Sequence, residues 1–275
     1  MNSVRFPIFG MASQLPQPKD LTTFADFGFL SNEAESMRWS GSTDTSAYLE
    51  LVKTAVCNVH ADLQILHGSP IAGSEWPALG LWERTLEACQ GAAMLADRGM
   101  VPSAIALLRT GYECLFFTCA LWREKNVLDR MENKHTSELF AMAKRLKKEF
   151  PPDELSPEVW EMLQSHAVEP KGSQISAFEA AEIADMKKAY ASVWAGLSTL
   201  GTHATTRSLH SYAPQVKGEE FHSTVGPKFT DANQIFNLAH ACLRMGQQHF
   251  RAHFTQFTFG PPISDRSPEE RGTAS

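Results

Sequence analysis

A long apolar stretch with two charges in its middle limits what this chain can fold into. Residues 104–122 are almost all hydrophobic or small, but Arg109 and Glu113 lie near the centre of the stretch. Two charges at bilayer depth are costly in a membrane span. A helix that is apolar nearly all round is typical of the centre of a helical bundle. We therefore expect a buried central helix over about residues 102–124, in a soluble protein that does not enter a membrane.

Apolar residues elsewhere recur every three or four positions, which is the helical period. Pro77 suits a first helical turn and Gly99 a helix C-terminus, and no segment alternates as strands do. We predict an all-α fold, a multi-helix bundle of about six or seven helices around one core. The remaining helices are expected at about residues 45–68, 77–98, 127–150, 157–166, 177–200 and 230–257.

The ends of the chain differ from its middle. Residues 1–44 mix Pro, Gly, Ser and Thr without a sustained period, so we expect an N-terminal arm there. Residues 45–258 form one all-α domain in this interpretation. The polar residues 259–275 are expected to be a disordered tail.

Charge and cysteine content narrow the class of protein. The net charge of −6 argues against a surface built over its whole extent to hold a polyanion. The five cysteines are an odd number and contain no CxxC pair, which is typical of buried thiols in a reducing compartment. We therefore expect a cytoplasmic protein.

Arg109 and Glu113 are one helical turn apart, so their side chains lie on the same side of the central helix. Two interpretations stay open. The pair is a structural ion pair that fixes helix packing, or it belongs to a polar pocket inside the bundle.

The segment after residue 200 is rich in Ser, Thr and His and has no helical or strand period. His203 follows the preceding helix most closely and could exchange protons near neutral pH. A solvated connection is the alternative. In the functional interpretation, Arg109, Glu113 and His203 form an interior polar cluster.

Arg130 and His135 have the R-x4-H spacing used by HEPN-type ribonucleases. In such enzymes the Arg is taken to stabilise phosphate charge, and the His to assist proton transfer or position the 2′-hydroxyl. Arg244 and His249 repeat the spacing, which shows how readily so short a motif arises by chance.

Metal and cofactor sites have little support in the sequence. Cys242, His249 and His253 share one arc of the last helix, but histidines beside an apolar stripe are usually packed and hydrogen-bonded. Glu132-x-x-His135 is half of a di-iron motif without its second half. The chain has no Walker loop, GxGxxG or GxSxG, so we expect no metal and no cofactor.

Two segments resemble a prokaryotic family of all-helical proteins known only as a domain of unknown function. They are AIALLRTGYE at 104–113 and YASVWAGLSTLGTH at 190–203. The resemblance covers about residues 78–212. It implies an Arg-x-x-x-Glu on a central helix and a later Leu-Ser followed by His, here Arg109, Glu113, Leu197, Ser198 and His203. The family is distantly similar to HEPN-type domains, and the resemblance implies no settled activity.

Two functional hypotheses follow. The first is an HEPN-like, RNA-directed effector of bacterial defence or stress, which cleaves or binds RNA without metal. Its candidate residues are Arg109, Glu113, His203, Arg130 and His135. The second is a non-catalytic helical module that binds a small anionic ligand or a protein partner. We expect a homodimer in either case, and whether the protein is an enzyme stays open.

Overall fold

A computed structural model of the chain describes its helical body. The described residues are 29, 31, 33, 43–73, 75–151, 154–165, 172–201, 215–217, 220–222, 226–227, 229 and 231–261; for residues 43–46, 215–217 and 220–222 this means the backbone alone. Most of the predicted arm (1–44) and tail (259–275) lies outside this set, and so does His203.

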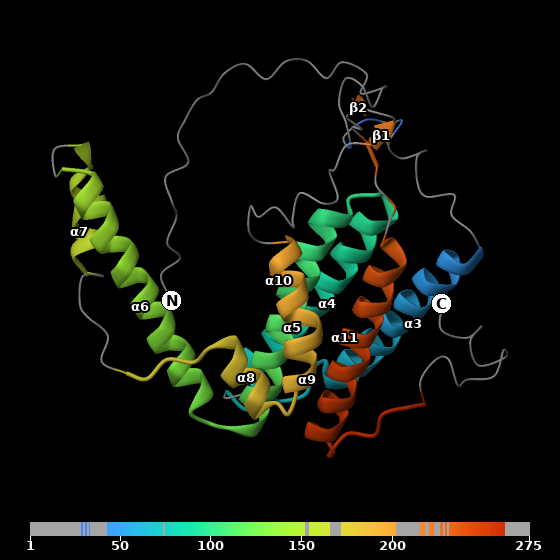
Figure 1. The fold of residues 1–275 in the computed structure, drawn as a ribbon. Coiled ribbons are helices and arrows are strands. Elements are labelled where there is room, and N and C mark those ends of the chain that lie inside the picture. The colour runs from blue at the N-terminus through green and yellow to red at the C-terminus, as the bar shows by residue number, and fades with distance from the viewer. Residues whose placement is uncertain are drawn as a thin grey trace.

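Helices dominate the described residues, and the predicted all-α fold is confirmed. Five helices have 22 to 24 residues: α3 (Thr43–Leu66), α4 (Trp76–Asp97), α5 (Val101–Arg123), α6 (Val127–Glu149) and α11 (Ala232–His253). Figure 1 shows α3, α4, α5 and α11 side by side as a bundle.

The turn between α4 and α5 follows from local sequence. Gly99 has a φ of 75°, a left-handed conformation that costs glycine little. The amides of Gly99 and Met100 then donate to the carbonyls of Ala96 (3.0 Å) and Leu95 (2.8 Å), which caps α4. Pro102 sits in the first turn of α5, where its missing N–H costs nothing.

α5 is the centre of the fold. It packs on α4, α11, α8 and α10. Among the described helices it alone is long and apolar enough to cross a membrane, but 67% of that apolar window is buried in the bundle. The prediction of a buried central helix is confirmed.

The core closes most tightly between α4 and α11. Trp82 is fully buried, and a Cβ added at Gly246 would lie 2.1 Å from its ring. Glycine at 246 therefore lets the two helices approach. Burying a large apolar side chain of this kind is worth roughly 1.5–3 kcal/mol.

A cluster of three polar side chains ties α3 to α11; we call Asp62, Gln247 and Arg251 the Asp62 cluster. The Asp62 carboxylate accepts from Arg251 Nε and Nη2 (both 2.7 Å) and from Gln247 Nε2 (2.8 Å). The Asp62 side chain is only 3% exposed. The negative charge of Asp62 is therefore compensated within the protein by Arg251 and by the hydrogen bond from Gln247, as a buried carboxylate requires.

The prediction of one continuous helix over residues 177–200 was wrong, because the structure divides this segment into four helical pieces. The pieces are α8 (Ala177–Ile183), α9 (Lys187–Ala189), the π-helix η3 (Tyr190–Trp194) and α10 (Ala195–Gly201). The first break lies at Asp185, whose φ of 59° is left-handed. The bend lets both α8 and α10 pack on α5.

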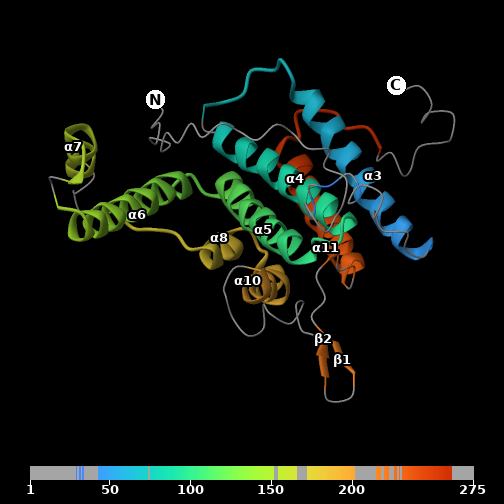
Figure 2. The ribbon, with the colours of Figure 1, turned by 90° about the horizontal axis from the view of Figure 1, so that it is seen from above.

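α6 and the short helix α7 (Pro157–Ser165) project from the bundle as an arm (Figures 1 and 2). In α6 only Val127 and Ala143 are fully buried. Residues 172–176 return beside α6, where Asn133 Nδ2 donates to the Ser173 carbonyl at 3.2 Å.

Two predictions near the C-terminus were also wrong in detail. The segment expected to lack strands contains the antiparallel pair β1 (Gln215–Lys217) and β2 (Glu220–His222). Three-residue strands are too short to show an alternating pattern in the sequence. The last helix begins at Ala232 and ends at His253, inside the predicted 230–257.

Candidate functional site

Arg109 is the best-connected charged residue of α5. Its Nη1 lies 3.1 Å from Glu113 Oε2, one turn further along the helix. Its Nε donates to Ser198 Oγ of α10 at 3.0 Å, and its guanidinium carbon lies 4.7 Å from the centroid of the Trp194 ring. We call Arg109, Glu113, Ser198 and Trp194 the Arg109 cluster. It joins α5 to η3 and α10, and three side chains contact the guanidinium.

The π-helix η3 brings Trp194 to Arg109. Its wider turn pairs the Ala195 amide with the Tyr190 carbonyl five residues earlier. Tyr190 stacks on Trp194, with ring centroids 4.7 Å apart and an interplanar angle of 19°. Trp194 Nε1 is buried and has no hydrogen-bond partner in the described part of the chain. An unpaired buried donor is unusual, and it lies next to a guanidinium.

Glycine at the end of α10 sets the position of Ser198. A Cβ at Gly201 would lie 2.7 Å from Ile105 Cγ2 and 2.9 Å from the Ala106 backbone nitrogen. Real Cβ atoms do not approach so closely, so only glycine lets α10 lie this near α5. The close approach places Ser198 within reach of Arg109.

A recess of about 260 Å³ opens beside this cluster, between α4 and α5. Two residues with guanidinium groups, Arg84 and Arg109, and one with a carboxylate, Glu113, line it. The exposed Arg84 makes no ion pair with another described residue. We call this the Arg109 recess, and its remaining wall consists of Leu81, Thr110, Cys114 and Phe117.

The recess is suited to binding and offers no nucleophile. Burial raises the pKa of the Cys114 thiol to about 11, although Arg84 acts in the opposite direction. The thiol is therefore protonated at neutral pH and unreactive. Thr110 Oγ1 donates to the Ala106 carbonyl at 3.2 Å.

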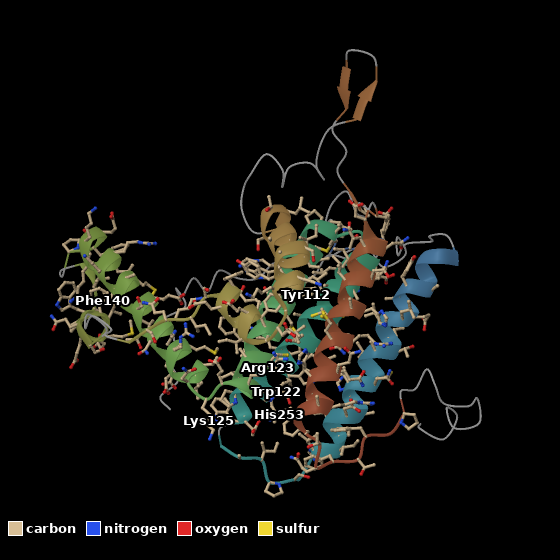
Figure 3. The ribbon with its side chains drawn as sticks, turned by 60° about the horizontal axis from the view of Figure 1, so that its bottom comes forward. Tyr112, Trp122, Arg123, Lys125, Phe140 and His253 are labelled. Carbon is tan, nitrogen blue, oxygen red and sulfur yellow. The ribbon has the colours of Figure 1, made fainter. Side chains whose placement is uncertain are left out.

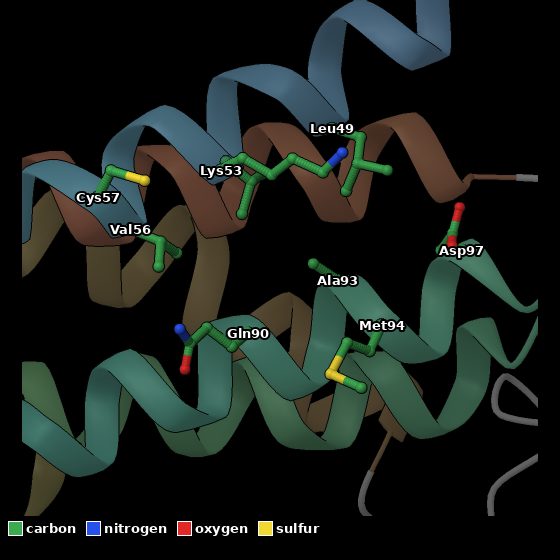
Figure 4. Close-up of a pocket in the computed structure, with 9 residues that line it drawn as sticks. Leu49, Lys53, Val56, Cys57, Gln90, Ala93, Met94 and Asp97 are labelled. Atoms are coloured by element: carbon green, nitrogen blue, oxygen red, sulfur yellow. The ribbon is translucent and has the colours of Figure 1, made fainter. Parts of the chain in front are cut away.

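A larger groove of about 690 Å³ lies between α3 and α4 (Figure 4). Leu49, Val52, Val56, Ala93 and Met94 make its walls apolar. Lys53, at its edge, pairs with Glu50 at 2.6 Å. Lys53 and Asp97 are the charged residues that line the groove, and it has no guanidinium group, which distinguishes it from the Arg109 recess.

The predicted cluster of Arg109, Glu113 and His203 is described in part. The structure brings Arg109 and Glu113 together and adds Ser198 to them. His203 lies outside the described residues, so its part of the prediction stays a prediction.

Arg130 and His135 are not brought together by α6. Arg130 Nη2 donates to Glu179 Oε1 at 2.7 Å and to the Gln174 carbonyl at 2.9 Å. Residues five apart point about 140° away from each other around a helix. His135 is exposed. In this structure Arg130 holds the segment before α8.

Glu179 has a second role beside Arg130. It completes the N-terminal capping box of α8, in which its carboxylate accepts from the Ser176 amide and hydroxyl. The bond from the Ser176 amide is the main reason that the pKa of Glu179 lies below its usual value, and Arg130 adds to the effect.

The last helix, α11, carries Cys242, His249 and His253, the residues considered for a metal site. Cys242 is fully buried, and burial lowers the pKa of His249. No three His, Cys, Asp or Glu side chains in the described ranges are grouped to hold a metal ion. Arg244, of the second R-x4-H match, lines a small recess of about 190 Å³ with four polar side chains: Asn58, Gln247, Gln248 and Arg251.

Three participants were missed from the sequence. Trp194 contacts Arg109 from η3, and Arg84 lines the same recess from α4, but no local sequence pattern marks either residue. Asp62 did carry a signal, because it lies three residues after Val59 on the apolar side of its helix.

The fold and the site define an all-helical protein with an Arg-x-x-x-Glu on its central helix, braced by a later Ser. The chain belongs to the family of unknown function DUF5677, whose sequence model matches residues 75–220. The match includes the Arg109 cluster and excludes Asp62 and Arg251. No match to the chain was found among curated proteins or solved structures.

Proposed function

We propose that the protein is a helical module that binds a small anionic ligand in the Arg109 recess. One observation supports this most strongly. The guanidinium of Arg109 is fixed by Glu113, Ser198 and Trp194 while it lines an open recess that also holds Arg84. Groups held in place before binding lose little freedom on binding, which favours affinity.

The chemistry of the recess indicates the kind of ligand. A guanidinium presents a planar fork that matches carboxylate and phosphate oxygens. Two such groups and one carboxylate leave the recess with an excess positive charge. Glu113 would accept from a hydroxyl on the ligand. A recess of about 260 Å³ suits a ligand of few atoms, so we expect a small phosphate ester or hydroxy acid.

The RNA-directed hypothesis requires a different arrangement of residues. It needs Arg130 and His135 to act on one phosphate, but the Arg130 guanidinium is engaged by Glu179. The homodimer expected from the sequence stays a proposal. So does the cytoplasmic location of a soluble protein, which the burial of α5 supports.

A ligand that binds only the folded state raises the thermal midpoint. We expect glycerol phosphate at millimolar concentration to raise it for the wild-type protein. Arg109→Lys keeps the charge but loses the fork, so the rise should largely disappear. Arg145→Lys on the exposed side of α6 is the matched control and should respond as the wild type does.

The same preparations test the alternative. In the binding proposal single-stranded RNA stays intact with wild-type protein, with or without EDTA. Cleavage that persists in EDTA and is lost in His135→Ala would replace the proposal with the RNA-directed one. Equal stabilisation of wild type and Arg109→Lys would show that the anion binds elsewhere.

A further inference from the structure

The arm formed by α6 and α7 projects from the bundle. α6 has 23 residues and is therefore about 35 Å long, at about 1.5 Å per residue. Its main helix contacts are with α5 and α7. Figure 3 shows Phe140 out on the arm, away from Tyr112 in the middle of the bundle. Most of α6 therefore lies outside the bundle and cannot bury its apolar side chains there.

Apolar residues along α6 form a seam that the bundle does not cover. Of the arm, only Val127 and Met131 belong to the bundle core or pack against it. Further along, Leu139, Met142 and Leu146 follow one another at steps of three and four residues. Met142 is 39% exposed, and the two leucines are partly exposed. This spacing is that of a coiled-coil seam, in which a second helix covers the apolar residues.

α7 covers a different side of α6. Ala143 and Leu163 are buried in the arm, and the Lys147 ammonium lies 5.2 Å from the centroid of the Trp160 ring. α7 therefore lies beside Ala143 and Lys147, whereas Met142 points about 100° away from Ala143 around the helix. α7 has 9 residues, and a helix that short is marginal by itself. The seam around Met142 stays open to a further helix.

A stripe of four charged residues runs along one edge of the seam. Lys134, Glu138, Arg145 and Glu149 lie within an arc of about 60° around α6, and Met142 lies beside that arc. Glu138 follows Lys134 by four positions, as Glu149 follows Arg145, and the charge alternates in sign. We call these four residues the charge stripe. Reversing the direction of the charge stripe exchanges the sign at every position.

This symmetry matches the charge stripe to a second copy of itself. In an antiparallel pair of α6 helices, Glu138 of each copy faces Arg145 of the other, and Lys134 faces Glu149. A parallel pair would place like charges opposite each other, which is unfavourable. Residues four apart can also pair within one helix. In the described part of the chain, however, none of the four forms an ion pair, and Lys134 lies over the Phe117 ring at 5.9 Å.

We propose that two copies of this chain associate through α6, in antiparallel orientation. Leu139, Met142 and Leu146 of each copy pack on those of the other, and the two charge stripes pair beside them. The same surface is used on both copies, so the assembly closes as a two-fold dimer. The homodimer expected from the sequence thereby has a defined interface, independent of anion binding in the Arg109 recess.

The mass of the full chain in solution tests the seam, by size-exclusion chromatography with light scattering. We expect about twice the monomer mass of 30.5 kDa at high micromolar concentration. Met142→Lys places a charge in the seam and should weaken the dimer about tenfold or more. Met94→Lys is the matched control, because Met94 is 63% exposed on α4 and lines the groove between α3 and α4. It should leave the mass unchanged.

Charge reversal tests the antiparallel orientation. The pairs are exposed, so the loss of one charge matters little, but a reversed charge is repelled. Glu138→Arg and Arg145→Glu should each weaken the dimer about tenfold. The double variant with both changes should restore it, because every pair is again opposite in sign. Far-UV circular dichroism checks that the variants stay helical.

Three results would overturn the proposal. The first is a wild-type monomer at high micromolar concentration. The second is dissociation by Met94→Lys in place of Met142→Lys, which would move the interface to the groove between α3 and α4. The third is a double variant no better associated than the single ones. None of these positions lines the Arg109 recess, so glycerol phosphate binding would be unaffected by any of the three.

Discussion

Two charged clusters join helices in this protein, and they are built differently. In the Asp62 cluster the carboxylate accepts three hydrogen bonds and its side chain is 3% exposed. In the Arg109 cluster the ion pair is longer, at 3.1 Å, and its two side chains are 24% and 28% exposed. The Asp62 carboxylate is enclosed, although Arg251 is 26% exposed and lines a recess of about 190 Å³ with Arg244. In the second cluster the carboxylate of Glu113 itself lines the recess, beside a further arginine, Arg84.

The difference separates a structural role from a binding role. The buried Asp62 carboxylate already accepts from three donors, so the loss of its counter-charge is costly. A partly exposed pair contributes less to stability and can still meet an anion. Substitutions in the Asp62 cluster should therefore mainly lower stability. Substitutions in the Arg109 cluster should mainly change the affinity for an anion.

The largest effect on stability is expected from Arg251→Ala. It leaves the buried Asp62 carboxylate without its counter-charge, so the free energy of unfolding should fall by about 3–5 kcal/mol. Urea denaturation at neutral pH measures this. The exposed Arg145→Ala should change the value by less than about 0.5 kcal/mol. A loss below about 1 kcal/mol in Arg251→Ala would mean that the cluster is not closed.

The next largest effect on stability is expected where α10 packs on α5. Gly201→Ala forces a Cβ against Ile105 and the Ala106 backbone, so it should cost about 1–3 kcal/mol. It should also weaken anion binding, because Ser198 moves with α10. Gly196→Ala, on the same helix with nothing within 4 Å, should stabilise by up to about 1 kcal/mol. Equal effects of the two changes on unfolding would contradict this packing.

A smaller effect is expected from Glu113→Gln. Arg109 keeps Ser198 and Trp194, and the pair is partly exposed, so the loss should be about 1 kcal/mol. Removing the negative charge should at the same time tighten glycerol phosphate binding. Suppose Glu113→Gln lowered the free energy of unfolding as much as Arg251→Ala does and left glycerol phosphate binding no tighter. The two clusters would then have the same, structural role.

The smallest expected effect is a dependence of the free energy of unfolding on pH, which neither cluster causes. Burial lowers the pKa of His240 and His249 below that of an unfolded histidine, near 6.5. The unfolded chain then binds protons more readily, so stability should fall as the pH drops from about 7.5 towards 5.5. His249→Gln should flatten this slope in urea denaturation across that range. An unchanged slope would show that His249 is not its source.

Local features of the fold could be predicted from the sequence. Gly99 and Pro102 act on their own turns, and the i,i+4 spacing of Arg109 and Glu113 makes them neighbours on any helix. The left-handed break at Asp185 could not be predicted, because no interruption of the apolar pattern accompanies it.

The contacts that join different helices in both clusters could not be predicted from the sequence, for a related reason. Arg251 lies 189 positions from Asp62 and Ser198 lies 89 from Arg109, and no periodicity relates residues so far apart. Trp194 contacts Arg109, and Arg84 shares its recess, only through the packing of η3 and α4 on α5. Arg109 and Glu113 could be named from the sequence, but their contacts with other helices could not.

Arg84→Met tests the central claim most directly, because Arg84 lines the recess without an ion pair to any described residue. Calorimetric titration with glycerol phosphate, combined with urea denaturation of the same protein, gives both quantities. We predict a fall in affinity of about tenfold or more, with the free energy of unfolding unchanged within about 0.5 kcal/mol. Wild-type affinity in Arg84→Met would contradict the account, since the anion would then not lie in the Arg109 recess.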